Sequence, residues 1–141
     1  MKFKLKTFPD FGLLVIRLVL GLSYVIAHGG VKLFAGPATW TKVGSAVSLF
    51  GINFMFTAWG LLAACSEFFG GILILLGLFF RPASVFIIIT MLVAANQGLN
   101  TGKSLSSIVY PLELGITILG LFFTGPGKYS LDFYLFGKKR I

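Results

Sequence analysis

Four long apolar stretches dominate the pattern of hydrophobic and polar positions along the chain. They cover residues 11–31, 57–80, 82–97 and 107–124. A helix needs about 20 apolar residues to cross the hydrocarbon core of a bilayer. The third and fourth stretches are short for this purpose, but local thinning of the bilayer accommodates short spans at modest cost. The pattern predicts an all-α integral membrane protein, a bundle of four membrane-spanning helices.

The segments between these stretches fit four spans. Arg81-Pro82 predicts a tight turn before the third span, because proline disfavours a helical conformation at the preceding residue. Residues 98–106 are polar and contain glycine, which is typical of a loop. In the segment between the first two spans, apolar side chains recur at helical spacing. We predict a short amphipathic helix in the membrane interface at residues 41–50, with Trp40 as an anchor and a packed loop as the alternative.

Composition agrees with a membrane location. The hydrophobic fraction is 57%, the charged fraction is 11%, and the mean hydropathy is +0.96. Soluble domains carry about 25% charged residues, and disordered chains are more polar still. One cysteine, Cys65, excludes an internal disulfide, a cysteine-based zinc site and an iron–sulfur cluster within one chain. We take residues 1–141 as a single membrane domain.

The net charge of +8 comes from residues that flank the apolar stretches. This arrangement is typical of membrane topology signals and predicts no nucleic-acid partner, which would require a basic folded face. With four spans both termini lie on one side, together with most of the cations: Lys2, Lys4, Lys6, Arg81, Lys128, Lys138, Lys139 and Arg140. The opposite side holds Lys32, Lys42 and Lys103. The positive-inside rule therefore predicts that both termini are cytoplasmic.

Polar side chains inside the spans are the best pointers to function, because each is costly to place in lipid. The candidates for an intramembrane polar cluster or ligand site are Arg17, Tyr24, His28, Lys32, Glu67, Gln97 and Glu113. On a helix, each span gathers small and polar residues on one face. In the fourth span this face holds Ser106, Tyr110, Glu113, Thr117, Gly120 and Thr124. We expect the four faces to meet inside the bundle.

The predicted topology groups several of these side chains by depth. The outer half of the membrane receives His28, Lys32, Gln97 and Glu113, while Glu67 lies near the midplane and Arg17 in the inner half. A carboxylate in a dry interior needs a partner or a proton. We therefore expect Glu67 to pair with Arg17 or Lys32, and Glu113 to pair with Lys32 or His28.

Three interpretations of these polar groups stay open. Buried pairs can serve only to fix the register of the helices, they can form a pocket for a redox-active headgroup such as a quinone, or they can line a path for protons or a small solute. No nucleotide-binding loop, dinucleotide fingerprint or hydrolase motif occurs in the chain. No metal site and no covalently bound cofactor are predicted, and the catalytic residues, if any, are not identified.

Three short motifs follow one another along the chain. The first comprises residues 17–21 (RLVLG) and 27–33 (AHGGVKL). The second is residues 67–71 (EFFGG), followed by Leu-Gly-Leu and Arg81-Pro82. The third is residues 125–132 (GPGKYSLD). Together they extend over nearly the whole chain and resemble the motifs of the DoxX family.

The resemblance implies a multi-pass protein of a bacterial inner membrane. Founding members of the family are associated with thiosulfate:quinone oxidoreductase, where such a chain forms a membrane subunit. The resemblance thus implies at most a membrane subunit of a quinone-linked oxidoreductase. The partners of such a protein would be the lipid bilayer and either other protein subunits or further copies of the same chain. The resemblance carries no family-wide assignment of catalytic residues.

These observations lead to one main hypothesis and two alternatives. The main hypothesis is a redox-associated subunit with a site for a quinone-like molecule in the outer half of the membrane. In it Lys32 and His28 contact the quinone oxygens, Gln97 orients the ring, and Glu67 and Glu113 relay protons. The alternatives are a non-catalytic assembly subunit of a larger membrane complex and a pathway for small solutes or protons.

Overall fold

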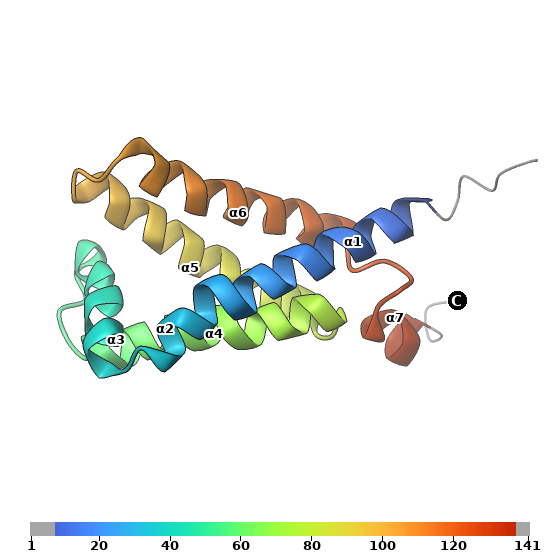
Figure 1. Ribbon diagram of the computed structural model, residues 1–141, viewed down its shortest axis with the longest axis horizontal. Helices are drawn as coiled ribbons and strands as arrows, with labels where there is room; N and C mark the ends of the chain where they lie inside the picture. Colours follow the sequence, from blue (N-terminus) through green and yellow to red (C-terminus); the bar gives the residue numbers. More distant parts are fainter. Residues whose placement is uncertain (1–7, 138–141) are drawn as a thin grey trace, which may run out of the picture.

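Four long helices, each apolar enough to cross a membrane, form the body of the protein (Figure 1). The computed structural model describes residues 8–137, so Lys2, Lys4, Lys6, Lys138, Lys139 and Arg140 lie outside the described residues. The spans are Phe8–Phe34, Phe56–Leu76 (α4), Phe80–Asn100 (α5) and Leu105–Thr124 (α6). The first span consists of α1 (Phe8–Ser23), a π-helical segment η2 (Tyr24–Gly30) and α2 (Val31–Phe34). The predicted four-span, all-α architecture is confirmed.

Two short helical regions lie at opposite ends of the bundle (Figure 1). One comprises α3 (Pro37–Gly44) and the 3₁₀ helix η3 (Ser45–Phe50), which connect the first span to α4. It confirms the predicted short helix but begins at Pro37, because proline suits the first turn of a helix. The other is α7 (Leu131–Phe136), which lies at the same end as the start of α1. We call these ends the α3 end and the α7 end.

The turn between α4 and α5 lies a few residues earlier than the sequence pattern predicts. α4 ends at Leu76 instead of residue 80, because Gly77 adopts a left-handed conformation (φ 64°) that terminates the helix. The amide of Gly77 donates to the carbonyl of Ile74, and the amide of Leu78 donates to that of Leu73. α5 then begins at Phe80 with Pro82 in its first turn, so the third span is longer than expected.

Helix α4 is the central element of the bundle. It packs against α1 and η2, against α3 and against α5, whereas α6 packs mainly on α5. Glycines permit these close approaches, since a Cβ atom at Gly60 would collide with the backbone carbonyl of Trp40. A Cβ atom at Gly29 would likewise collide with the backbone at Phe68. Of the small residues on the predicted faces of the first two spans, Gly21 is buried against α4, whereas Gly60 is buried against α3 and Gly70 against α5.

The predicted inward orientation of the polar face of α6 is wrong. Tyr110, Glu113, Thr117 and Gly120 are all exposed. The buried face instead consists of Pro111, Gly115, Ile118 and Leu121, with Gly115 lying against Met91 of α5. Helical periodicity identifies which residues share a face but not which face is buried. α6 packs through its apolar face, with the small residue Gly115 at the contact.

The outward faces of the spans carry large apolar side chains. Val19 and Ile26 on the first span, Phe69 on α4, and Ile116 and Phe123 on α6 are each more than half exposed on the surface of the chain. A soluble protein does not expose apolar surface over the full length of its helices. These faces contact the hydrocarbon of a lipid bilayer.

Candidate functional site

An ion pair between α2 and α4 lies inside the bundle toward the α3 end. The Nζ atom of Lys32 donates to both carboxylate oxygens of Glu67, at 2.6 Å to Oε1 and 2.7 Å to Oε2. The Glu67 side chain is fully buried, and that of Lys32 is 27% exposed. The indole N–H of Trp40 donates to the carbonyl of Lys32 at 2.9 Å and so holds α3 beside α2. Of the two cations predicted to pair with Glu67, the structure selects Lys32.

A cavity of about 600 Å³ lies beside this ion pair, between α3 with η3, α4 and α5. Its walls are mainly apolar and include Val43, Val47, Leu62, Phe86 and Ile89. Its polar side chains are Lys32, Ser66, Glu67, Thr90 and Gln97. Small-molecule sites combine apolar walls of this extent with a few polar groups that fix orientation. We call this space the ion-pair cavity.

Trp59 is a cavity residue that the sequence analysis missed. It lies in the first turns of α4, and its indole Nε1 is buried without a hydrogen-bond partner in the described part of the chain. An unpaired buried N–H costs free energy unless a ligand or water accepts from it. A tryptophan near the end of a span is usually an interfacial anchor, so its residue type gave no separate signal of a ligand site.

Three of the seven predicted site residues line the ion-pair cavity: Lys32, Glu67 and Gln97. Lys32 and Glu67 come from the first two spans, and Gln97 comes from near the end of α5. Thr90 and Ala94, which share the helical face of Gln97, also line the cavity. The predicted polar face of the third span therefore faces this cavity.

A second polar group, outside the ion-pair cavity, connects η2 to α6. The Nε2 atom of His28 and the hydroxyl of Tyr110 lie 2.9 Å apart, within hydrogen-bond distance. The Tyr24 ring lies 5.5 Å from that of His28, and its buried hydroxyl has no hydrogen-bond partner among residues 8–137. Glu113 lies one helical turn beyond Tyr110 and is exposed, with no ion-pair partner within the described chain. Tyr24, His28 and Glu113 are thus not part of the lining of the ion-pair cavity.

Arg17 lies at the α7 end and serves a different contact. Its side chain is almost fully buried, and Nη2 donates to the backbone carbonyl of Tyr129 at 2.6 Å. Gly77 leaves the space for the guanidinium, since a Cβ atom there would collide with it. Arg17 therefore fixes the segment before α7 against the first span and does not pair with Glu67.

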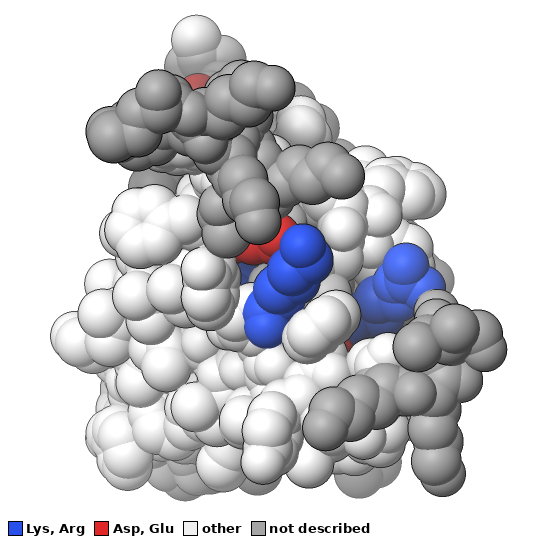
Figure 2. Space-filling view, turned by 90° about the vertical axis from the view of Figure 1, so that its right-hand side faces the viewer, with Lys and Arg blue, Asp and Glu red and all other residues white. Residues whose placement is uncertain are grey.

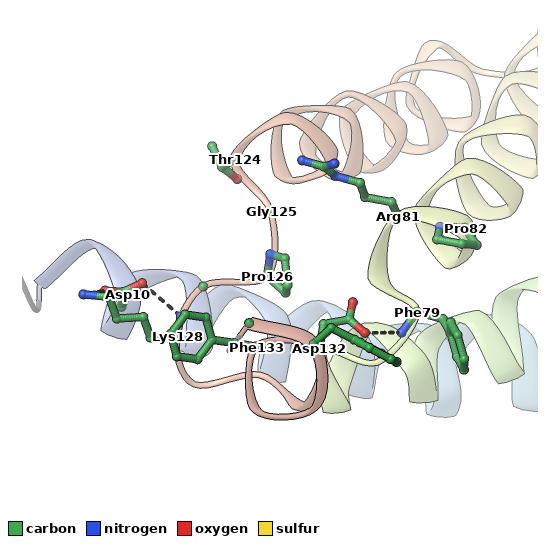
Figure 3. Close-up of a pocket in the computed structure, with 13 residues that line it drawn as sticks. Asp10, Phe79, Arg81, Pro82, Thr124, Gly125, Pro126, Lys128, Asp132 and Phe133 are labelled. Atoms are coloured by element: carbon green, nitrogen blue, oxygen red, sulfur yellow. Dashed lines mark hydrogen bonds and ion pairs between the residues drawn. The ribbon is translucent and has the colours of Figure 1, made fainter. Parts of the chain in front are cut away.

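A second cavity, of about 650 Å³, lies at the α7 end between the start of α5, the end of α6 and α7 (Figure 3). Its charged lining residues are Asp10, Arg81, Lys128 and Asp132. Asp132 accepts from the backbone N–H groups of Phe79 at 2.8 Å and Phe80 at 2.9 Å, which caps α5. We call this space the α7 cavity.

Across residues 8–137, no group of three or more His, Cys, Asp or Glu side chains is arranged to hold a metal ion. The side chains that line the ion-pair cavity offer hydrogen bonds and charge within apolar walls. Such a site suits an uncharged amphipathic molecule with acceptor oxygens.

Comparison with known proteins identifies the family. No curated protein and no solved structure matches the chain. The sequence model of the family described as DoxX matches residues 12–99, which run from α1 almost to the end of α5 and include Lys32, Glu67 and Gln97. The stretch 125–132, which resembles the C-terminal motif of that family, lies beyond the match. Because the match covers more than half of the sequence, the chain belongs to the DoxX family.

Proposed function

We propose that this DoxX-family protein is a membrane subunit of a redox system and that it binds a quinone-like molecule in the ion-pair cavity. The observation that carries the proposal is the arrangement around Glu67. A fully buried carboxylate, its Lys32 partner and the indole N–H of Trp59, which is unpaired within residues 8–137, border one apolar space of about 600 Å³. This volume falls within the range of about 300–1,000 Å³ that is usual for small-molecule sites.

The donors around the cavity match the chemistry of a quinone headgroup. A quinone carries two carbonyl oxygens on a flat apolar ring, so it needs two hydrogen-bond donors between apolar walls. Trp59 supplies one N–H, and the ammonium of Lys32 retains a third N–H beyond the two directed to Glu67. The amide of Gln97 offers a further donor. An isoprenoid tail would extend between the apolar side chains of α4 and α5.

This proposal differs from the sequence-based hypothesis in its residues. Lys32 and Gln97 keep their roles in contacting and orienting the headgroup, Glu67 keeps its role in proton relay, and Trp59 joins them. His28 and Glu113 leave the site, because neither lines the ion-pair cavity and His28 instead contacts Tyr110 of α6. Proton exchange with the headgroup would pass through the Lys32–Glu67 pair.

The proposed location is a bacterial inner membrane with the α7 end in the cytoplasm. Arg81 and Lys128 lie at that end, whereas Lys42 and Lys103 lie at the α3 end. The basic residues at both ends of the sequence add to the α7 side. The ion-pair cavity then belongs to the outer half of the membrane.

Fluorescence titration tests the proposal directly. A Trp40→Phe variant leaves Trp59 as the sole tryptophan, and a bound quinone should quench its emission. We expect a short-chain ubiquinone analogue to quench this variant saturably in detergent, and Gln97→Leu to weaken the binding. Glu113→Gln is the matched control and should bind as the parent does. Absence of saturable quenching in the parent, or equal weakening by the control, would contradict the proposal.

A second candidate function is a non-catalytic assembly subunit, and the polar face of α6 favours it. Glu113, Thr117 and Gly120 are exposed along the middle and second half of a membrane-spanning helix. A carboxylate facing hydrocarbon is costly, and a partner helix would relieve that cost through hydrogen bonds and close packing. Crosslinking from a photoreactive residue at position 117 in native membranes would identify such a partner. Crosslinks to lipid alone would count against this function.

A further inference from the structure

The α7 cavity lies at the depth of the lipid headgroups. Its lining includes Arg81, the second residue of α5, and Thr124, the last residue of α6. These spans have 21 and 20 residues, so each is about 30 Å long and matches the hydrocarbon thickness of a bilayer. Groups at their ends therefore meet the phosphates of the adjoining leaflet, whichever face of the membrane this is.

Two cations reach this cavity from different elements. Figure 2 shows this end of the molecule, where basic side chains stand out on a largely uncharged surface. The Arg81 side chain extends from the start of α5 toward the end of α6 (Figure 3). Its guanidinium lies 5.9 Å from the centre of the Phe122 ring, and it forms no ion pair with a carboxylate among residues 8–137. Lys128 approaches from the loop before α7.

The two carboxylates in the lining are already engaged. Asp132 uses both oxygens to accept from the amides of Phe79 and Phe80. Asp10 accepts from the backbone N–H of Lys128 at 3.0 Å and lies 3.5 Å from its ammonium nitrogen. Neither carboxylate neutralises Arg81, so its guanidinium is available to an external anion.

Aromatic side chains complete the walls and continue outward. Phe79, Phe133 and Phe136 line the cavity, together with Pro82 and Pro126. α7 also exposes Tyr134 and Leu135 on the surface. Aromatic residues of this kind concentrate at membrane interfaces, where they contact both headgroups and the upper part of the acyl chains.

From this juxtaposition we propose that the α7 cavity binds an anionic phospholipid. Arg81 contacts the phosphate through its planar fork of N–H donors, and the exposed ammonium of Lys128, which is paired with Asp10, borders the same space. The acyl chains descend along the lipid-facing sides of α5 and α6, and the aromatic side chains of α7 cover the glycerol region. The α7 cavity and the ion-pair cavity share no lining residue, so this proposal does not depend on quinone binding.

Native mass spectrometry of the full chain in detergent provides the test. Phosphatidylglycerol is titrated against the wild type, Arg81→Gln, Arg81→Lys and the control Lys103→Gln, which removes an exposed cation at the opposite end. We expect Arg81→Gln to weaken binding of phosphatidylglycerol about tenfold, with Arg81→Lys intermediate and Lys103→Gln unchanged. Phosphatidylcholine should bind weakly to all four proteins.

Three results would overturn the proposal. The first is equal binding of phosphatidylglycerol and phosphatidylcholine to the wild type. The second is full retention of phosphatidylglycerol by Arg81→Gln while circular dichroism shows that its helix content is unchanged. The third is displacement of the lipid by millimolar inorganic phosphate, which would assign the site to free phosphate instead of a membrane lipid.

Discussion

At the scale of single residues, Glu67 and Glu113 show how differently the same side chain can be placed in a membrane helix. Both lie within apolar spans, yet Glu67 is fully buried with Lys32 at 2.6 Å while Glu113 is exposed on α6. A buried carboxylate whose partner is removed keeps its desolvation cost and loses the compensating attraction. The stability of the protein should therefore be far more sensitive at Lys32 and Glu67 than at Glu113.

The first prediction concerns Lys32→Met, which leaves Glu67 without a cation. We expect a loss of about 3 kcal/mol in the free energy of unfolding, the cost usual for breaking a buried ion pair. Unfolding in mixed micelles, followed by circular dichroism, measures this loss. Lys42→Met on α3 is the matched control, since Lys42 is exposed and forms no ion pair within residues 8–137.

The double variant Lys32→Met/Glu67→Leu separates stability from function. Replacing both charges with apolar groups of similar size is often neutral for stability, so we expect it to recover most of the loss. In the Trp40→Phe background, quinone quenching of Trp59 should be absent from this folded variant. A double variant that folds and still binds quinone would show that the pair has only a structural role.

Asp132 caps the start of α5, and substituting it tests how much this cap contributes to stability. Asp132→Ala removes the acceptor for the amides of Phe79 and Phe80 and should destabilise this junction by about 1 kcal/mol. Hydrogen exchange at these two amides should accelerate, while that of the α6 amides stays unchanged. Asp132→Asn retains one acceptor oxygen and should give an intermediate rate. Unchanged exchange in Asp132→Ala would mean that water replaces the carboxylate at no cost.

At the scale of elements, the sequence predicts helices well and their packing faces less well. Length and hydropathy sufficed for four spans, and the small faces around Gly21 and Gly70 are buried as expected. For α6 the same reasoning failed, because a polar face has two alternatives in a membrane protein: the interior of its own bundle or a neighbouring surface. Gly115, buried among apolar residues, is the small residue of α6 that lies against Met91 of α5.

The contact between α3 and α4 gives a prediction at this scale. Gly60→Ala should separate the two helices and destabilise the fold, because the added methyl group would collide with the backbone carbonyl of Trp40. Backbone cannot yield as a flexible side chain does, so we expect a loss of about 2 kcal/mol, typical of overpacking. Thermal unfolding in detergent measures it.

Gly120→Ala is the matched control for this substitution. Gly120 lies within α6, and a Cβ atom there has nothing within 4 Å. Alanine favours helix over glycine by up to about 1 kcal/mol, so this control should be neutral or slightly stabilising. Equal destabilisation by both substitutions would mean that the close approach of α3 to α4 does not limit stability.

At the scale of the whole molecule, the sequence predicted the polar residues but not how they divide. Lys32, Glu67 and Gln97 meet at one cavity, His28 joins Tyr110 on the α6 side, and Arg17 holds the segment before α7. Depth along each span was predictable from residue counts, whereas rotation about each helix axis depends on contacts between elements distant in sequence. The ion-pair cavity also needs η3 as a wall; the helical spacing of this segment predicted its apolar face but not that the face packs over α4 and α5.

Orientation in the membrane is the last property of the whole molecule to test. In a Cys65→Ala background, Lys103→Cys places a single thiol at the α3 end, and Tyr134→Cys places one on the exposed surface of α7. With the α7 end cytoplasmic, a membrane-impermeant maleimide should label Lys103→Cys in intact bacterial cells and Tyr134→Cys only after permeabilisation. The reverse pattern would contradict the orientation set by the basic residues. It would also move the ion-pair cavity to the cytoplasmic half of the membrane, where quinone would exchange protons with the cytoplasm.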